Sequence, residues 1–290
     1  MTSELTETLA STSLLQPSKR RRIPVVGTIA YAVLAVYVLL AIVGPLLVPY
    51  PPNQLNVGPR LAPPGPEFWF GTDALGRDLL SRVVAAIRPA LVAAATATAI
   101  ALVIGTLFGL AAGYWRGAVD GVISRIVDFL FAVPEYLLAI LVLAVLGSGL
   151  VNAAVAIGIV FIPRFARTVR GSTLEIMSRN YIDAARLSGR GGAWIMSRHL
   201  LPNIASPLVV ITAINLSTAT GAYAALSFLG FGVRPPDADF GSMIADSLQY
   251  LTADAWVVVP PAVAFVILIL AINLAGDALR DRLDPRSVSR

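Results

Sequence analysis

The chain contains no cysteine and very little lysine or histidine, and these shortages remove several kinds of site. Without cysteine there is no disulfide framework and no thiolate metal site, and nothing indicates the redox compartment. Lys19 is the only lysine and His199 the only histidine. A P-loop needs a lysine at the end of a glycine-rich loop, whereas Lys19 stands in an arginine run. The sequence therefore predicts that this chain has no P-loop of its own.

Charged residues are also scarce, whereas apolar residues dominate. Only 13% of residues are charged, 57% are hydrophobic and the mean hydropathy is +0.77, which is too apolar for a soluble domain. Because roughly 20 apolar residues cross the hydrocarbon core of a bilayer, the sequence predicts an all-α polytopic membrane protein with about six transmembrane helices. We place them over residues 24–48, 89–113, 125–147, 150–170, 204–230 and 256–278.

The N-terminus carries the first topological signal. Residues 1–23 are rich in serine and threonine and end in a Lys-Arg-Arg-Arg run at residues 19–22, so we expect a disordered cytoplasmic tail. The apolar run that follows is too long for a signal-peptide core and has no small-residue cleavage site, so the first span should be retained. With six spans the C-terminal tail, residues 279–290, is cytoplasmic as well. The net charge of +5 then follows from the positive-inside rule, without nucleic acid.

The remaining arginines agree with this orientation, with one exception. The segment after the fourth span is expected to be cytoplasmic because it is arginine-rich, whereas the loop after the fifth carries Arg234 against four aspartates. The first external loop dissents, since it contains Arg60, Arg77, Arg82 and Arg88. Apolar residues recur there at helical spacing over residues 79–88, which predicts an interfacial amphipathic helix with its charges among the lipid headgroups.

A hydrophilic segment, residues 180–202, separates the fourth and fifth spans. Asn180 followed by Asp183 is typical of a capped helix start. Glycines 189, 191 and 192 should end this short helix before a second one over residues 193–199, and Pro202 should break the helix before span five. This helix–turn–helix has no paired carboxylates, no nucleophile with a base and no metal-ligand spacing.

The same segment resembles the EAA loop of ABC-importer permeases. The match is a D-A-A-x3-G-x9-H-x-L-P pattern, made by Asp183, Ala184, Ala185, Gly189, His199, Leu201 and Pro202. Three further stretches, residues 71–82, 226–236 and 276–286, resemble the dipeptide/oligopeptide branch of that family in its second-permease (DppC/OppC-like) type. The chain departs from the family pattern at Asp183, where glutamate is usual, and at Gly191-Gly192, which loosens the turn.

The resemblance implies a type I ABC importer permease (MetI-like) fold in a bacterial inner membrane. It divides the chain into a first helix with an external segment, residues 24–88, and a permease core, residues 89–278, that includes a coupling loop over 171–203. It also implies a homologous permease, two ATPase subunits and an external substrate-binding protein as partners. The chain itself would hold no cofactor, because ATP and Mg²⁺ would bind the ATPases.

Polar residues inside the spans are candidates for the transport pathway. Glu135 lies about ten residues into the predicted third span, close to mid-membrane at about 1.5 Å per residue, where an ionisable group needs a partner or a water-filled path. Two roles are open to it, a structural or subunit-interface role and a place on the translocation path, and Pro134 is expected to bend the helix beside it. Asn152 and Asn215 are weaker candidates.

Rival functions follow from the same residues. An ion-coupled carrier would show several acidic groups within its spans, and Glu135 is the one clear mid-span acid. A channel and a membrane scaffold without transport are two further rivals. The resemblance favours an ATP-driven importer of short peptides, although similar permeases handle nickel chelates, glutathione or sugars. The chain is therefore expected to be a transport subunit and not an enzyme.

Overall fold

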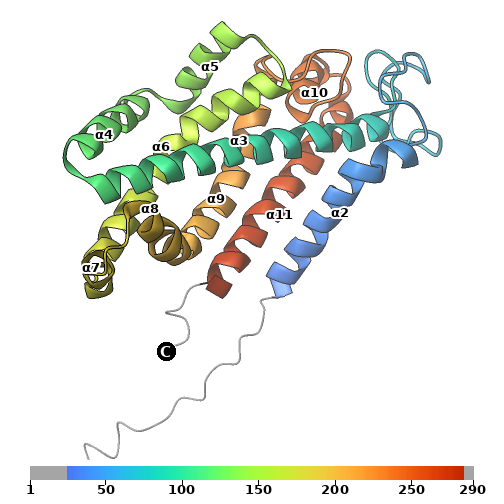
Figure 1. Cartoon of the computed structure of the whole chain (residues 1–290). Helices are drawn as coiled ribbons and strands as arrows, with labels where there is room; N and C mark the ends of the chain where they lie inside the picture. The colour runs from blue at the N-terminus through green and yellow to red at the C-terminus, as the bar shows by residue number, and fades with distance from the viewer. Residues whose placement is uncertain (1–24, 284–290) are drawn as a thin grey trace, which may run out of the picture.

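The computed structural model describes residues 25–283 as an assembly of helices, and within that range no strand is formed. Figure 1 shows the long helices packed around α3, with α7 at one end of the molecule and α10 at the other. The α-helices are α2 (Val25–Leu47), α3 (Leu79–Trp115), α4 (Gly117–Ala132), α5 (Glu135–Leu146), α6 (Leu150–Met177), α7 (Asn180–Leu187), α8 (Gly192–Ile195), α9 (Leu201–Phe228), α10 (Phe240–Ser247) and α11 (Val259–Leu283).

The prediction of about six spans is confirmed, with one change in its third member. Five helical stretches are long and apolar enough to cross a membrane, and α4 with α5 supplies a sixth if this bent pair is one span. The two halves meet at 97°. Pro134, which precedes α5, accounts for the bend because proline cannot continue the hydrogen bonding of α4. The single helix expected over residues 125–147 is therefore two helices, whereas the expected bend at Pro134 is confirmed.

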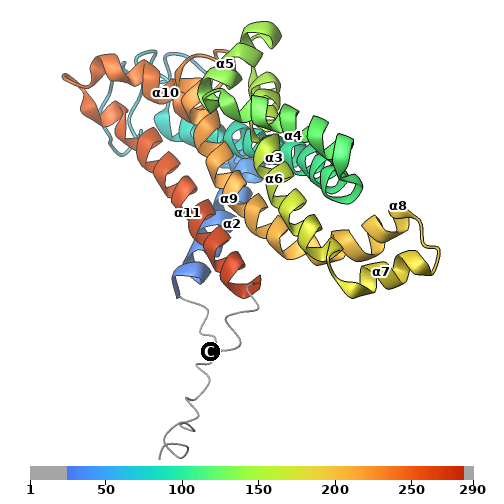
Figure 2. The same cartoon turned by 90° about the vertical axis from the view of Figure 1, so that its left-hand side faces the viewer.

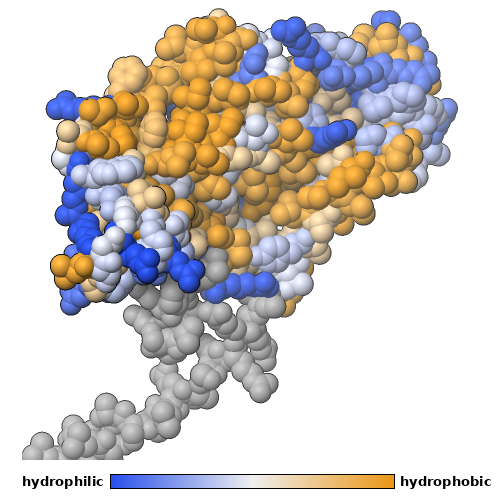
Figure 3. Space-filling model, in the orientation of Figure 1, coloured by the Kyte–Doolittle hydropathy of each residue, from blue (hydrophilic) through white to orange (hydrophobic). Residues whose placement is uncertain are grey.

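Figure 3 shows that apolar and hydrophilic residues occupy different parts of the molecular surface. Apolar residues cover the middle of the molecule, and hydrophilic residues gather at the end that carries α7 and at the end that carries α10. The start of α2 and the end of α11 lie at the α7 end (Figures 1 and 2). The start of α2, the end of α11 and α7 therefore lie on the same side of the apolar middle region.

Small residues hold the centre of the fold together. Gly105, Gly109 and Gly113 follow each other at intervals of four along α3 and face α6. A Cβ atom added to each would lie 2.5, 2.6 and 2.6 Å from the Cβ atoms of Phe165, Val169 and Thr173, respectively. Membrane helices associate closely through such small-residue spacing, since lipid provides no hydrophobic drive between them.

The register of this contact also explains the bent span. Gly105 faces Phe165 and Gly113 faces Thr173, so α3 and α6 run parallel. A chain that leaves α3 must return to its starting side before α6 can begin in the same direction. The α4–α5 pair makes that return, which supports counting it as one broken crossing.

Several predicted boundaries are wrong because helices continue through them. Residues 79–88 form the first turns of α3 and not a separate interfacial helix, and Leu79, Val83 and Ile87 are buried in the main core. The boundary placed between residues 88 and 89 therefore falls inside a helix. The fourth span, predicted over residues 150–170, continues as α6 to Met177, and residues 279–283 belong to α11 and not to a tail. The tail predictions for residues 1–23 and 284–290 lie outside the described residues.

The glycine contact gives a direct prediction for stability. Gly109→Val should weaken the α3–α6 packing by about 2 kcal/mol, because the added methyl groups would overlap Val169 and the carbonyl oxygen of Ala166. The melting temperature of the purified protein in detergent should fall accordingly. Gly121→Val is the matched control, since a Cβ atom at Gly121 meets nothing within 4 Å. Equal melting temperatures for the two variants would contradict this packing role.

Candidate functional site

Helix α7 and the turn that follows form a compact knob, residues 180–200, which an apolar plug fixes to the long helices. Ile182 of α7, Ile195 of α8 and Leu200 are fully buried. They pack in one cluster with Leu110 of α3 and with residues of α6 and α9, namely Val169, Met177 and Ile204. Because this cluster joins the knob to three long helices, a force on the knob reaches all three.

The outer surface of the knob holds most of the residues that resemble the EAA loop. Asp183 and Ala184 are exposed, and Leu187 is 90% exposed at the end of α7. Asp183 lies in the first turn of α7 and pairs with Arg186 at 3.4 Å. Ala185 instead turns inward and packs against the plug. The exposed apolar and small side chains give this face a shape that another protein can approach closely.

The turn after α7 follows the glycine pattern. Gly189 adopts a positive φ of 74°, which favours glycine, and a Cβ atom there would meet nothing within 4 Å. The predicted cap at Asn180 is wrong: the cap position is Arg179, which makes no side-chain cap hydrogen bond. The helix break predicted at Pro202 is also wrong, because a π-helical turn, Met196–Leu200, continues directly into α9. Pro202 occupies the first turn of α9, where its missing N–H costs little.

His199 lies within this knob and contacts two of its aromatic side chains. Its ring lies 5.6 Å from the ring of Tyr181 and 5.0 Å from that of Trp194, measured between centroids. Its backbone carbonyl accepts a hydrogen bond from Asn203 Nδ2 at 2.6 Å. The histidine thus ties α7 and α8 to the π turn, whereas Leu201 is exposed at the start of α9.

Three ion pairs connect the broken span to α6, and sequence reasoning missed them as a set. Arg164 pairs with Glu135, Arg167 with Asp128 at 2.8 Å, and Arg170 with Asp120 through two hydrogen bonds of 2.6 Å. The arginines are three residues apart on α6, and the acids lie at intervals of seven or eight residues on α4 and α5. The available signal was the periodicity within each set: intervals of three, seven and eight residues are close to whole helical turns and place each set near one helix face.

The prediction that Glu135 lies about ten residues into one continuous third span is therefore wrong. Glu135 is the first residue of α5, directly after the bend, and its carboxylate meets the Arg164 guanidinium. Asn152 donates to the carbonyls of Leu146 and Gly147, at 2.7 and 3.2 Å, and so closes the end of α5. Asn215 is buried in α9 and donates to the carbonyl of Ile211 at 2.9 Å. A small cavity beside Glu135 is lined by neither asparagine, so the structure does not gather the three residues into one site.

The stretch at residues 71–82 forms a charged clasp at the α10 end of the molecule. Asp73 accepts hydrogen bonds from the backbone N–H groups of Leu75 and Arg77. Its carboxylate also forms an ion pair with Arg77 Nε at 2.6 Å. Arg82 is only 4% exposed; it lies 3.6 Å from Asp73 and donates to the backbone carbonyls of Pro52 and Pro236. The expectation that this arginine lies among lipid headgroups is wrong, because it joins two loops far apart in sequence.

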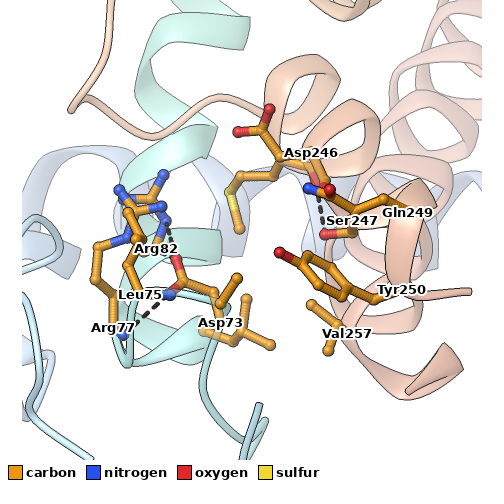
Figure 4. Close-up of a pocket in the computed structure, with 12 residues that line it drawn as sticks. Asp73, Leu75, Arg77, Arg82, Asp246, Ser247, Gln249, Tyr250 and Val257 are labelled. Carbon is orange, nitrogen blue, oxygen red and sulfur yellow. Dashed lines mark hydrogen bonds and ion pairs between the residues drawn. The ribbon is translucent and has the colours of Figure 1, made fainter. Parts of the chain in front are cut away.

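Figure 4 shows this clasp as one wall of a pocket of about 210 Å³, with Asp246, Gln249 and Tyr250 on the opposite wall. Within the same stretch, Asp78 caps the start of α3 by accepting hydrogen bonds from the Ser81 N–H and hydroxyl groups, at 2.8 and 2.6 Å. Among the described residues no group of side chains could hold a metal ion. The stretch therefore organises the loops at this end and begins α3.

A buried carboxyl, that of Asp239, caps the start of α10 nearby. Asp239 is 1% exposed, and its Oδ1 accepts a hydrogen bond from the Gly241 N–H group at 2.9 Å. Its Oδ2 has no hydrogen-bond partner of normal geometry within the described range. Burial raises the pKa of the Asp239 carboxyl, and the nearby hydroxyls of Ser227 and Tyr223, which favour ionisation, offset only part of that effect.

The fold and these contacts define a polytopic α-helical membrane protein whose knob, docked on the spans, is its main hydrophilic projection at one end. Residues 105–289 match the family described as binding-protein-dependent transport system inner membrane component, and residues 20–64 match the N-terminal transmembrane domain of oligopeptide transport permease C. The chain belongs to this family of ABC-importer permease subunits, which are membrane components and not enzymes.

Similar proteins include permeases of dipeptide and glutathione transport systems. The chain is 38% identical over 271 residues to the dipeptide transport system permease protein DppC of Alkalihalophilus pseudofirmus, covering 93% of this chain and 88% of the relative. It is 42% identical over 234 residues to the glutathione transport system permease protein GsiD of Pectobacterium atrosepticum, covering 81% and 76%. A solved inward-facing structure of the MetNI methionine ABC transporter shares the fold, with a TM-score of 0.57 and 24% identity over 70% of this chain and 96% of that one.

The buried carboxyl of Asp239 predicts a pH-dependent stability. Burial raises the pKa of Asp239 in the folded state above its ordinary value of 3.8. The protonated carboxyl therefore stabilises the folded state most fully below pH 3.8, and this contribution to the free energy of unfolding is lost as pH rises through the raised pKa. Each unit of elevation corresponds to about 1.4 kcal/mol. Asp239→Asn cannot ionise and keeps the acceptor for Gly241, so its advantage in melting temperature over the wild type should grow as pH increases from 4 to 7. A constant difference across that range would contradict the prediction.

Proposed function

We propose that this chain is one of two transmembrane subunits of an ATP-driven importer of short peptides, coupled to cytoplasmic ATPases through the knob at residues 180–200. The observation that carries the proposal is the knob itself. Its outer face exposes Ala184 and Leu187 to a partner, while its inner face is plugged into α3, α6 and α9. A surface built in this way receives motion on one side and passes it to the spans on the other.

Each partner in this proposal has a separate support. The family is that of binding-protein-dependent transport systems, which favours an external substrate-binding protein and a second permease. ATP and Mg²⁺ would be bound by the ATPase subunits. The arginine-rich knob and the shared end of α2 and α11 favour a cytoplasmic location for both termini. The peptide substrate rests on the name of the dipeptide relative.

Closure of the ATPases would move the knob as a near-rigid lever. The plug connects it to α3 and α6, whose glycine contact leaves little freedom for relative sliding, and the π turn makes it continuous with α9. The spans from α4 to α9 would then change between outward-facing and inward-facing arrangements. The ion pairs from α6 to α4 and α5 are partly exposed and would let the bent span readjust as α6 moves.

Glutathione is the second substrate candidate. It is supported by the 42% identity to the glutathione permease over 81% of this chain. Glutathione is itself a short peptide derivative, so both candidates agree on a flexible, zwitterionic solute. The substrate bound by the cognate external binding protein distinguishes the two.

Changes on the outer face of the knob should separate docking from folding. Ala184→Trp and Leu187→Glu should each lower ATPase co-purification by about tenfold, because loss of one interface hot spot costs about 1.4 kcal/mol or more. Membrane insertion and melting temperature should be unaffected, since both side chains are exposed. Ser178→Trp, an exposed change to the same bulky residue outside α7, is the control and should retain the ATPases. Full ATPase recovery with both knob variants would overturn the coupling proposal.

The Glu135–Arg164 pair tests the proposed pathway. We infer that Glu135 faces the substrate route, because its carboxylate is half-buried beside a small cavity and is already paired with a cation of the same chain. Glu135→Gln should lower uptake of free-amine peptides by about tenfold, equivalent to about 1.4 kcal/mol, because the carboxylate that would meet the amine is gone, and Arg164→Gln should lower it because Glu135 loses its cation. The double variant leaves neither charge unpaired, yet uptake of free-amine peptides should stay low because the carboxylate is still absent. Complete recovery of uptake in the double variant would show that the pair is only structural.

A further inference from the structure

A groove of about 520 Å³ runs between α2, α3, α9 and α11, away from the knob's outer face and from the ion pairs. Its walls are almost wholly apolar, with Leu34, Leu102, Val209 and Leu216 among them. Thr212 is one of the few polar lining residues, and its hydroxyl already donates to the carbonyl of Leu208 at 2.6 Å. The groove therefore offers contact surface to an apolar ligand and few free polar groups.

The length and position of the groove match one leaflet of a bilayer. On α9 the lining residues run from Ala205 to Leu216, a rise of about 16 Å at 1.5 Å per residue, and half of the hydrocarbon core is about 15 Å thick. Ala205 lies near the start of α9 and Leu279 near the end of α11. The groove thus begins at the end of the molecule that carries α7 (Figures 1 and 2) and stops near the middle.

The mouth of the groove is flanked by basic side chains. Arg282 lies over the ring of Tyr31, a lining residue, at 5.4 Å from the ring centroid. Arg280 belongs to the same last turn of α11. Successive residues of a helix are about 100° apart. The lining positions of α11, residues 272, 275, 276 and 279, therefore lie on one face. Arg280 and Arg282 fall about 80° to either side of that face, whereas Asp277 and Asp281 fall on the opposite face. The positive charges therefore face the mouth more closely than the acids of the same turns.

We propose that this groove binds one acyl chain of an anionic phospholipid of the leaflet next to the knob, with its phosphate held by Arg280 and Arg282. In a bilayer the acyl chain gains no hydrophobic energy by entering the groove, so affinity depends on close packing and on the phosphate contact. The ligand would tie α2 and α11 to α9 at the level where the knob begins.

A lipid fits the groove better than a partner helix does. Five large apolar side chains on α4 and α5 are each at least 60% exposed, namely Val122, Phe129, Leu137, Leu141 and Val145, and none of them lines the groove. This α4–α5 face offers a second permease an apolar surface of its own to bury, outside the groove. The groove is concave, narrow and one leaflet long, and these properties suit a single chain.

The test compares phospholipids bound to the purified chain, recovered with whatever subunits accompany it. Native mass spectrometry would count added phosphatidylglycerol and phosphatidylcholine of identical acyl chains. Val209→Trp fills the groove at a residue that is 38% exposed, and Ile214→Trp is the matched control on α9, 47% exposed and outside the lining. We expect Val209→Trp to lower phosphatidylglycerol occupancy at least about fivefold relative to the control. Arg280→Gln with Arg282→Gln should reduce the preference for phosphatidylglycerol by about 25-fold, since each basic residue contributes about a factor of five.

Three results would overturn the proposal. Equal lipid occupancy in Val209→Trp and the control would show that the groove holds no lipid. Loss of the second permease from Val209→Trp at unchanged lipid content would show that the groove is a protein interface. An unchanged lipid preference in the double arginine variant would exclude the phosphate contact. The readout does not depend on transport, so these outcomes are independent of whether the chain imports peptides.

Discussion

The close contact between α3 and α6 is the constraint on which the other features depend. Gly105, Gly109 and Gly113 let the two backbones approach until side-chain Cβ atoms of α6 occupy the space that Cβ atoms of α3 would need. The register of this contact shows that the two helices run parallel, so the chain between them has to return across the membrane. The broken span, the side of the molecule on which α7 emerges and the position of the plug all follow from this arrangement.

Different faces of helix α6 contact different parts of the structure. One face meets the glycines of α3, another presents Arg164, Arg167 and Arg170 to the bent span, and its last turns contribute Val169 and Met177 to the plug under the knob. A displacement of the knob therefore acts on a helix that is tightly fixed to α3 and joined to α4 and α5 by charges. This continuity provides the proposed importer with a physical route from its coupling surface to its spans without any long flexible connection.

The sequence was sufficient for features that depend on local composition. Long apolar runs predict the spans, glycines after a short polar helix predict the turn at Gly189, and Pro134 predicts the bend. It was insufficient where distant residues decide the outcome. Arg82 looked like a headgroup-level charge, yet carbonyls of Pro52 and Pro236 and the carboxylate of Asp73 surround it. Pro202 looked like a helix break, yet a π turn before it lets the helix continue. The glycine spacing in α3 was visible but could not name its partner helix.

The bent span is the part of this fold that is held least firmly. Val127 is the one buried residue of α4 and three are buried in α5, whereas α3 has a continuous buried face. Its other attachments are ion pairs, and partly exposed ion pairs contribute little to stability, roughly 1 kcal/mol or less each. Close packing such as that of α3 against α6 is costly to disturb, so motion is expected where apolar contacts are fewest. We infer that α3, α6 and the knob move as a unit during transport, and that α4 and α5, with Glu135 at their junction, readjust around them.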